Sequence, residues 1–145
     1  MSLHNISIVG LRSISQVQLT HRLMFHKNQD GLSIAQQLLT SPMAGAPIVD
    51  DEGHFIGFIS EFDILNAFES GRDIRQLVAE EIMVQDRIAI QDSTSLVDAV
   101  RLMKKHHILV LPVERNGIVV GSVTRQDLVR AWMAEGLGEE VLAQG

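Results

Sequence analysis

The chain alternates between stretches whose apolar residues have strand spacing and stretches whose apolar residues have helical spacing. The pattern predicts short strands at residues 20–26, 46–49 and 55–59, and again at 87–90, 109–113 and 118–123. Amphipathic helices are predicted at residues 32–39, 60–70, 95–105 and 125–133. The order strand, helix, strand, strand, helix therefore occurs twice.

Each predicted helix carries apolar residues on one side. They are Leu32, Ala35, Leu38 and Leu39 in the first, Phe62, Leu65 and Phe68 in the second, and Leu96, Ala99, Val100 and Met103 in the third. A further stripe predicts a helical linker between the halves, with Ile74, Leu77, Val78 and Ile82. The predicted organisation is an N-terminal segment of unassigned structure (1–21), a first repeat (22–71), the linker (72–83), a second repeat (84–134) and a C-terminal tail (135–145).

The phrase Gly-x-x-Ser/Thr-x-x-Asp links the two halves. It runs from Gly57 to Asp63 and again, 64 positions later, from Gly121 to Asp127. Leu32 aligns with Leu96 at the same offset, Pro47 with Pro112 at 65, and Gly53 with Gly117 at 64, so small length changes are predicted before the proline and in the hairpin turn. This indicates a duplication. Because one unit of about 60 residues buries only a marginal core, we expect a mixed α/β (α+β) fold in which two βαββα units pack as a pseudo-twofold pair.

Composition narrows the function. The 145 residues are 46% hydrophobic and 21% charged, which is typical of a globular protein, and the net charge of −6 disfavours nucleic acid as a partner. The absence of cysteine excludes disulfides and thiol chemistry. No signal peptide and no apolar run approaching about 18 residues is visible, so we expect a cytoplasmic protein without a membrane partner.

Together these features resemble a tandem pair of cystathionine-β-synthase (CBS) domains. The resemblance rests on Pro47-Ile48-Val49-Asp50 and Pro112-Val113-Glu114 at the hairpins, on Gly53 and Gly117 in the turns, and on the two phrases, and it covers about residues 22–133. It implies clefts that bind AMP, ADP, ATP, S-adenosylmethionine or a dinucleotide, and a regulatory role without catalysis or a required metal. It also implies a homodimer formed through helical faces and a regulated protein partner.

Within that resemblance the two phrases would bind ribose. Asp63 and Asp127, each in the first turn of a helix, would accept hydrogen bonds from ribose hydroxyls. Ser60 and Thr124 lie at helix starts, beside backbone N–H groups that favour phosphate. The strands around the hairpin prolines would supply the adenine slot, with Pro47, Ile48, Pro112 and Val113.

The two sites differ in the residue that follows the hydroxyl. Arg125 follows Thr124 and can meet a phosphate, whereas Glu61 follows Ser60 and would repel one. We therefore expect the Arg125 cleft to take the charged nucleotide. The Glu61 cleft would hold a nucleoside-like or cationic ligand such as S-adenosylmethionine, or stay empty.

Other interpretations remain open. Ser/Thr-x-x-Asp at a helix start is also a capping box, in which hydroxyl and acid each satisfy a backbone N–H. A structural dimerisation or scaffold module without ligand is the alternative to a sensor. An enzyme acting on nucleotides is disfavoured, because the sequence shows no nucleophile with a base, no phosphate-binding glycine loop and no zinc-protease helix. Adjacent His106 and His107 point in different directions on a helix and predict no metal site.

Overall fold

The computed structural model describes residues 9–134 of the chain. The first repeat contains β1 (Phe25–His26), α2 (Gly31–Leu39), β2 (Gly45–Val49), β3 (Phe55–Ser60) and α3 (Glu61–Glu69). The second contains β4 (Ile90–Gln91), α5 (Leu96–His106), β5 (Val110–Arg115), β6 (Ile118–Thr124) and α6 (Arg125–Trp132). The connecting segments contain η1 (Ile14–Gln16), η2 (Ile74–Gln76) and α4 (Ala79–Ile82). The predicted order of elements is confirmed in both halves.

Each repeat builds one three-stranded sheet. The strand orders are β1-β2-β3 and β4-β5-β6, with the first pair of each sheet parallel and the hairpin pair antiparallel. The register is repeated, since Phe25 pairs with Ile48 as Ile90 pairs with Val113. The two halves are thus copies of one mixed α/β unit.

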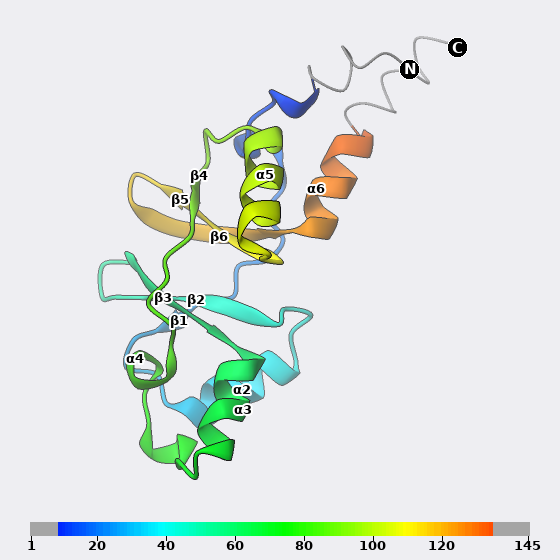
Figure 1. Cartoon of the computed structure of the whole chain (residues 1–145). Helices are drawn as coiled ribbons and strands as arrows, with labels where there is room; N and C mark the ends of the chain where they lie inside the picture. Colours follow the sequence, from blue (N-terminus) through cyan, green and yellow to red (C-terminus); the bar gives the residue numbers. More distant parts are fainter. Residues whose placement is uncertain (1–8, 135–145) are drawn as a thin grey trace.

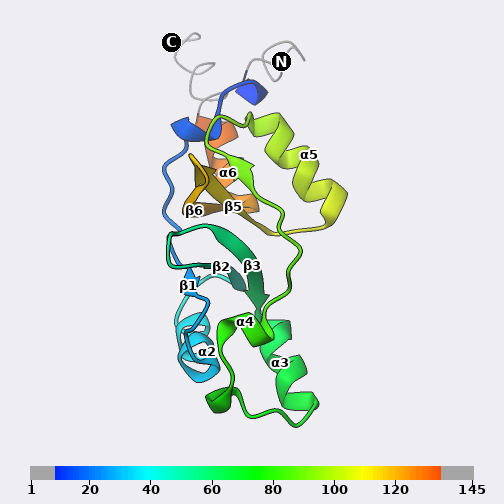
Figure 2. The same cartoon turned by 90° about the vertical axis from the view of Figure 1, so that its left-hand side faces the viewer.

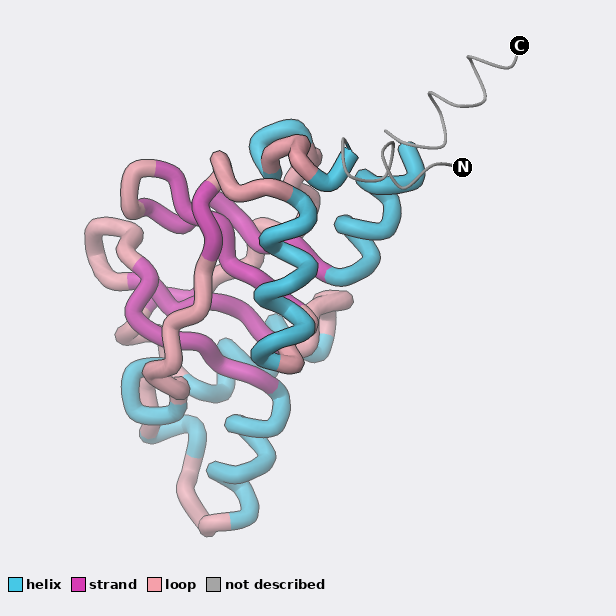
Figure 3. The backbone as a smooth tube through the Cα atoms, turned by 45° about the horizontal axis from the view of Figure 1, so that its top comes forward, coloured by secondary structure: helices cyan, strands magenta, loops and turns pink. Residues whose placement is uncertain are grey.

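The repeats pack through their sheets. Strands of both repeats lie in the middle of the molecule, with α2 and α3 at one end and α5 and α6 at the other (Figure 1), and Figure 3 shows the strands gathered between the helices. Val49, Phe55 and Val119 form a small buried cluster between the two sheets. The backbone N–H of Val119 also donates to the carbonyl oxygen of Gly53 across the interface, at 3.1 Å.

The connecting segments pack in a crossed manner. The N-terminal segment, which precedes the first repeat, packs on the second repeat, and the linker, which precedes the second repeat, packs on the first. Val9 and Ile14 of the N-terminal segment are buried in the core of the second repeat, and the N–H of Ile14 donates to the carbonyl of Thr94 at 2.8 Å. The linker instead packs on the first repeat, where Ile74, Ala79 and Ile82 are buried. Figure 2 shows the N-terminal segment running beside β6 towards α6, while α4 lies against the first repeat.

Two predicted helical faces are corrected. In α2 the buried residues are Gly31, Ile34 and Leu38, whereas Leu39 is 80% exposed. In α3, Ile64 and Ala67 are buried, and the expected face of Phe62, Leu65 and Phe68 is exposed. A period of 3.6 fits more than one set of apolar residues, and the contact with the sheet decides which set is buried.

The alignment of the first helices is corrected as well. Asp30 caps α2 and Ser95 caps α5, and the buried residues follow the same offset of 65, with Ile34 matching Ala99 and Leu38 matching Met103. The offset expected from Leu32 and Leu96 was 64. No length change therefore precedes the proline, and the single difference lies in the hairpin turn, where extra residues cost little.

The linker is not one continuous helix as predicted. Leu77, with φ −111° and ψ 148°, is extended and separates η2 from α4. Its backbone carbonyl accepts the N–H of Gly31 at 2.8 Å, which ties the linker to the start of α2. Among residues 9–134, no helix has the length and apolar character needed to cross a bilayer.

Candidate functional site

Both repeated phrases form capping boxes. The hydroxyl of Ser60 accepts the N–H of Asp63 at 3.3 Å, and the hydroxyl of Thr124 accepts that of Asp127 at 3.2 Å. In return Asp63 and Asp127 accept the N–H groups of Ser60 and Thr124, at 2.7 and 2.8 Å. The phrases therefore fix the start of α3 and α6 whether or not a ligand is bound.

Asp63 keeps one carboxylate oxygen for a ligand. Its Oδ2 accepts both the backbone N–H and the hydroxyl of Ser60, at 2.7 and 3.0 Å. Within the described part of the chain, no hydrogen bond or ion pair to Oδ1 is found. Because the side chain is only half-buried, Oδ1 can accept hydrogen bonds from a bound molecule.

Asp63 lines a cleft of about 650 Å³ between the repeats, called here the inter-repeat cleft. Three parts of the chain form its walls: the first repeat, the irregular segment before β4, and the end of α5 with the start of β5. The lining residues are Ala44, Gly45, Phe55, Phe58, Ser60, Phe62, Asp63, Val84, Asp86, Ile88, His106, His107, Ile108, Leu109, Val110 and Pro112. Its volume is in the range of small-molecule sites.

The inter-repeat cleft combines apolar walls with negative charge. Phe55, Phe58 and Ile88 provide apolar surface against which a planar ring can pack. Asp63 and Asp86 are its acidic groups, and no lysine or arginine is among its described lining residues. Such a site suits a neutral or cationic ligand better than a polyanion.

Asp127 is held differently from Asp63. It is 6% exposed, its Oδ1 accepts from Arg130 Nη2 at 3.1 Å, and its Oδ2 accepts from the N–H and hydroxyl of Thr124. Nε2 of His21 lies 3.5 Å from the same Oδ2. The carboxylate is thus engaged by the protein, and Asp127 does not line the inter-repeat cleft.

The structure does not bring Arg125 and Asp127 into one cleft. Arg125 is exposed and lines a groove of about 590 Å³ between α5 and α6, together with Leu109 and Trp132. The expectation that Arg125 marks the Asp127 cleft is corrected by helix geometry, since residues two apart differ by about 200° in direction. For the same reason Glu61, two residues before Asp63, is exposed and absent from the lining of the inter-repeat cleft.

The expected adenine slot is also corrected. Ile48 and Val113 are fully buried inside the cores of their own repeats and are absent from the lining of the inter-repeat cleft. Side chains alternate along a strand, so the neighbouring prolines face the other way. Both prolines are fully buried, and of the two only Pro112 is among the lining residues of the inter-repeat cleft.

Several cleft residues were not identified from the sequence. Val84 and Asp86 were assigned only to the start of the second repeat, and His107 was given no part in ligand binding. The sequence contained one indication for Val84: it lies at the start of the second repeat, shortly before the strand predicted at residues 87–90. The bridge between Val84 and Phe58 that brings it to the cleft is a tertiary contact.

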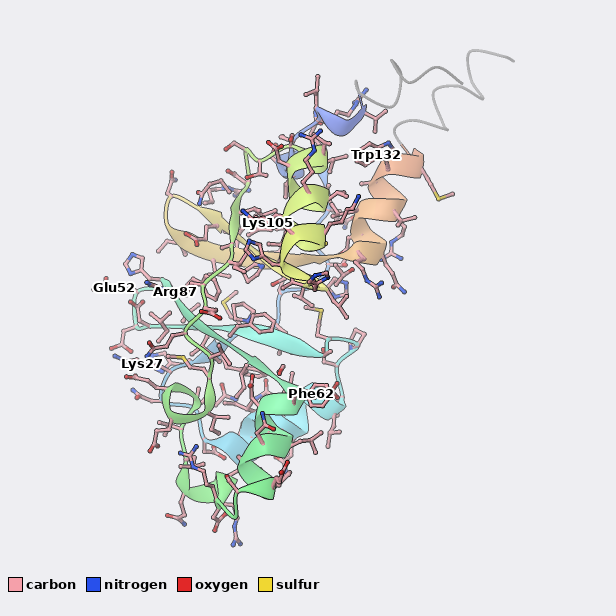
Figure 4. All side chains as sticks on the ribbon, in the orientation of Figure 1. Lys27, Glu52, Phe62, Arg87, Lys105 and Trp132 are labelled. Atoms are coloured by element: carbon pink, nitrogen blue, oxygen red, sulfur yellow. The ribbon has the colours of Figure 1, made fainter. Side chains whose placement is uncertain are left out.

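The β2–β3 turn carries the one group of possible metal ligands found among the described residues. The group consists of Asp50, Glu52 and His54. Each offers one ligand atom, and these three atoms lie within 4.8 Å of one another. Asp50 Oδ1 already accepts the N–H groups of Glu52 and His54, both at 2.9 Å. Glu52 lies at the opposite edge of the molecule from Phe62 in Figure 4, so this group is not part of the inter-repeat cleft.

Comparison with known proteins identifies the same architecture. The family model of the CBS domain matches residues 16–70 and 78–134. The chain is 30% identical over 104 residues to the uncharacterised protein MJ1225 of Methanocaldococcus jannaschii, covering 72% of this chain and 37% of that one. The chain spans 25–63% of the length of the first three curated relatives that it matches.

Solved structures share the fold. The CBS domain pair of protein MJ0100, in complex with 5′-methylthioadenosine and S-adenosyl-L-methionine, is 25% identical with a TM-score of 0.72, over 86% of this chain and 98% of that one. A putative acetoin utilization protein (AcuB) from Vibrio cholerae is 24% identical with a TM-score of 0.76, over 89% and 94% of the two chains. The second likeness concerns the fold alone.

Proposed function

Because the chain belongs to the CBS domain family, we propose that it is a non-catalytic regulatory module that binds an adenosine-containing ligand in its inter-repeat cleft. The observation that carries the proposal is the position of Asp63 Oδ1, which has no partner among the described residues and lines a cleft with apolar walls. A carboxylate oxygen there can accept from ribose hydroxyls, while the apolar walls hold the base.

We propose a ligand without phosphate groups, such as 5′-methylthioadenosine or S-adenosylmethionine. Asp63 and Asp86 would repel a phosphate, and no described lining residue is a lysine or arginine to offset them. The complex of the MJ0100 domain pair with these two ligands supports the choice. This agrees with the expectation for the Glu61 cleft, but with Asp86 as the source of the negative charge.

Calorimetric titration of the full chain tests the proposal. We expect 5′-methylthioadenosine to bind with a Kd at least about 10-fold lower than that of AMP or ATP, and Asp63→Ala to raise its Kd about 10- to 100-fold, since a charge-assisted hydrogen bond contributes about 1.5–3 kcal/mol. Asp98→Ala, on the exposed face of α5, is the matched control. An unchanged Kd in Asp63→Ala would contradict the assignment.

The alternative is a scaffold without ligand. Thermal unfolding separates the two functions, because a ligand at about 100 times its Kd adds about 2.7 kcal/mol to the free energy of unfolding. Stabilisation by an adenosine compound supports the sensor. A panel of nucleosides, nucleotides and S-adenosylmethionine that leaves the melting temperature unchanged would favour the scaffold, and product formation from any of them would overturn the non-catalytic role.

We further propose that two copies associate through the outer faces of α3 and α6. Phe62 is 75% exposed, and Leu65, Phe68, Val129 and Met133 are each more than half exposed. Large apolar side chains gathered on helices at both ends of the molecule are typical of an interface. Ligand binding would regulate this association, or a protein partner, only if the ligand binds one arrangement more tightly than another.

A further inference from the structure

The groove between α5 and α6, called here the α5–α6 groove, is an apolar surface with basic groups beside it. Its volume is about 590 Å³. Leu109, Val129 and Met133 are apolar lining residues that are at least half exposed, and the charged lining residues are Lys104 and Arg125. No described lining residue is acidic, and within the part of the chain that the structure describes neither cation has an ion pair. The groove is therefore a local positive site in a chain whose net charge is −6.

The outer face of α3 has the complementary character. Phe62, Leu65 and Phe68 are each more than half exposed and form an apolar stripe. Glu61 and Glu69 lie four residues before and four residues after Leu65, so both carboxylates are on the side of the helix that carries the stripe. Both are exposed, and neither carboxylate has a hydrogen-bond or ion-pair partner among the described residues. The face thus combines apolar surface with two unpaired negative charges.

The two surfaces lie at opposite ends of one side of the molecule. Figure 2 shows α3 and α5 along the same side, one in each repeat, and Figure 1 shows α6 next to α5. A twofold axis perpendicular to the long axis of the molecule can therefore place α3 of each copy on the α5–α6 groove of the other. Such a dimer forms the same contact twice and leaves neither surface uncovered.

Charge distinguishes this head-to-tail arrangement from a head-to-head one. If α3 packed on the α3 of a second copy, Glu61 and Glu69 would meet the same two carboxylates. At the other end, Lys104 and Arg125 would meet the same two cations. Like charges that are brought together at an interface oppose association. In the head-to-tail arrangement, each pair of carboxylates instead meets a pair of cations.

We propose that the chain forms a head-to-tail dimer in which α3 of each copy docks in the α5–α6 groove of the other. The apolar side chains of α3 cover the apolar floor of the groove, and Glu61 and Glu69 pair with Lys104 and Arg125. This inference rests on the proposed association of two copies. It adds the relative direction of the copies, the charged contacts between them and the occupant of the groove.

Two charge-reversed variants of the full chain test the arrangement by analytical ultracentrifugation. One is Glu61→Lys/Glu69→Lys, and the other is Lys104→Glu/Arg125→Glu. We expect each variant alone to have a dimer dissociation constant at least about 10-fold higher than the wild type, because like charges then meet at both contacts. An equimolar mixture should form a heterodimer with a dissociation constant within about 3-fold of the wild-type value. In that heterodimer one contact is wild type, and the other has its charges exchanged.

The control variant is Asp51→Lys/Glu52→Lys, which reverses two exposed carboxylates on the β2–β3 turn. Glu52 lies at the opposite edge of the molecule from Phe62 (Figure 4), so this variant should dimerise as the wild type does. Recovery of association in the mixture also shows that both charge-reversed variants are folded, since a misfolded chain would not regain a partner.

The outcomes separate this arrangement from the association itself and from adenosine binding. Charge-reversed variants that each dimerise like the wild type are expected of a head-to-head dimer, and would overturn the head-to-tail arrangement alone. A mixture that does not recover would do the same. A wild-type chain that stays monomeric would overturn both the arrangement and the proposed association. None of the four substituted residues lines the inter-repeat cleft, so both variants should bind 5′-methylthioadenosine with the wild-type Kd.

Discussion

Nε2 of His21 lies 3.5 Å from Oδ2 of Asp127, and the first repeat has no equivalent of this contact. His21 bridges to Ser122 as Val84 bridges to Phe58, so His21 and Val84 occupy corresponding positions. The imidazole of His21 therefore lies beside Asp127, whereas the apolar side chain of Val84 takes the corresponding position near Asp63 and leaves that carboxylate accessible. Together with the ion pair between Arg130 and Asp127, this difference explains much of the inequality between the two duplicated phrases.

Replacing His21 should make the duplicated sites more alike. We expect His21→Val to leave Asp127 Oδ2 without its imidazole neighbour and to allow a second adenosine ligand to bind, raising the stoichiometry with 5′-methylthioadenosine from one towards two. Native mass spectrometry measures the number bound. His54→Val, on the exposed β2–β3 turn, is the control. A stoichiometry that stays at one would show that His21 does not block the second site.

The two aspartates should differ in their contribution to stability. Asp63→Ala removes a cap and should lower the free energy of unfolding by about 1 kcal/mol. Asp127→Ala removes a cap and also leaves Arg130 and His21 without their buried partner, and should cost about 2–4 kcal/mol. Urea unfolding measures both. Equal losses would mean that the contacts with Arg130 and His21 contribute nothing.

Packing of the linker on α2 predicts an unfavourable glycine-to-alanine change. A Cβ at Gly31 would lie 2.7 Å from the carbonyl oxygen of Ile74 and 2.9 Å from Cδ1 of Ile82. Gly31→Ala should therefore destabilise the protein by about 1–3 kcal/mol, although alanine is the better helix former. Chemical denaturation measures the change, with Gln37→Ala on the exposed face of α2 as control. A more stable Gly31→Ala variant would refute the close contact.

The β2–β3 turn should weaken in acid. The backbone N–H of His54 hydrogen-bonds Asp50 and is the main cause that holds the pKa of this carboxyl below its usual value of 3.8. A pKa lowered by folding means that the carboxylate contributes stability above the unfolded pKa, and that this contribution is lost as pH falls through the folded pKa. NMR titration of the Asp50 carboxyl should give a midpoint below 3.8. In Asp50→Asn the turn should lose this acid-dependent step, and a normal midpoint in the wild type would contradict the hydrogen bond.

The exposed face of α3 gives a prediction for assembly. If it is an interface between two copies, Phe62→Glu should shift the protein from dimer to monomer, because a charge would be buried without a partner. Analytical ultracentrifugation measures the mass. Glu69→Gln, on the same helix, is the control. A Phe62→Glu variant with unchanged mass would exclude this face.

Local patterns predicted the repeat, the order of strands and helices, and the two helix starts, because hydrophobic period and capping depend on neighbouring residues. The directions of Arg125 and Glu61 could also have been predicted, since they follow from the turn per residue of a helix. The rest of the inter-repeat cleft could not. Val84 and His107 reach it only when the two repeats close on each other, and no local pattern encodes that contact.

The buried face of α2 was ambiguous for a related reason. Leu32 and Leu39 are apolar and correctly spaced, yet the linker and the sheet meet the side of the helix that carries Ile34. The sequence of the helix alone fits both choices. The contact with a segment about forty residues further along the chain selects one of them.

The sequence repeats are not the same as the units that could fold on their own, because each core includes residues from outside its repeat. A fragment ending at residue 71 would lack Ile74 and Ile82 from its core, and one starting at residue 84 would lack Val9 and Ile14. The smallest excisable first half therefore extends through the linker. The second half would need residues 9–21 reconnected to it, as in a circular permutant, before it could stand alone.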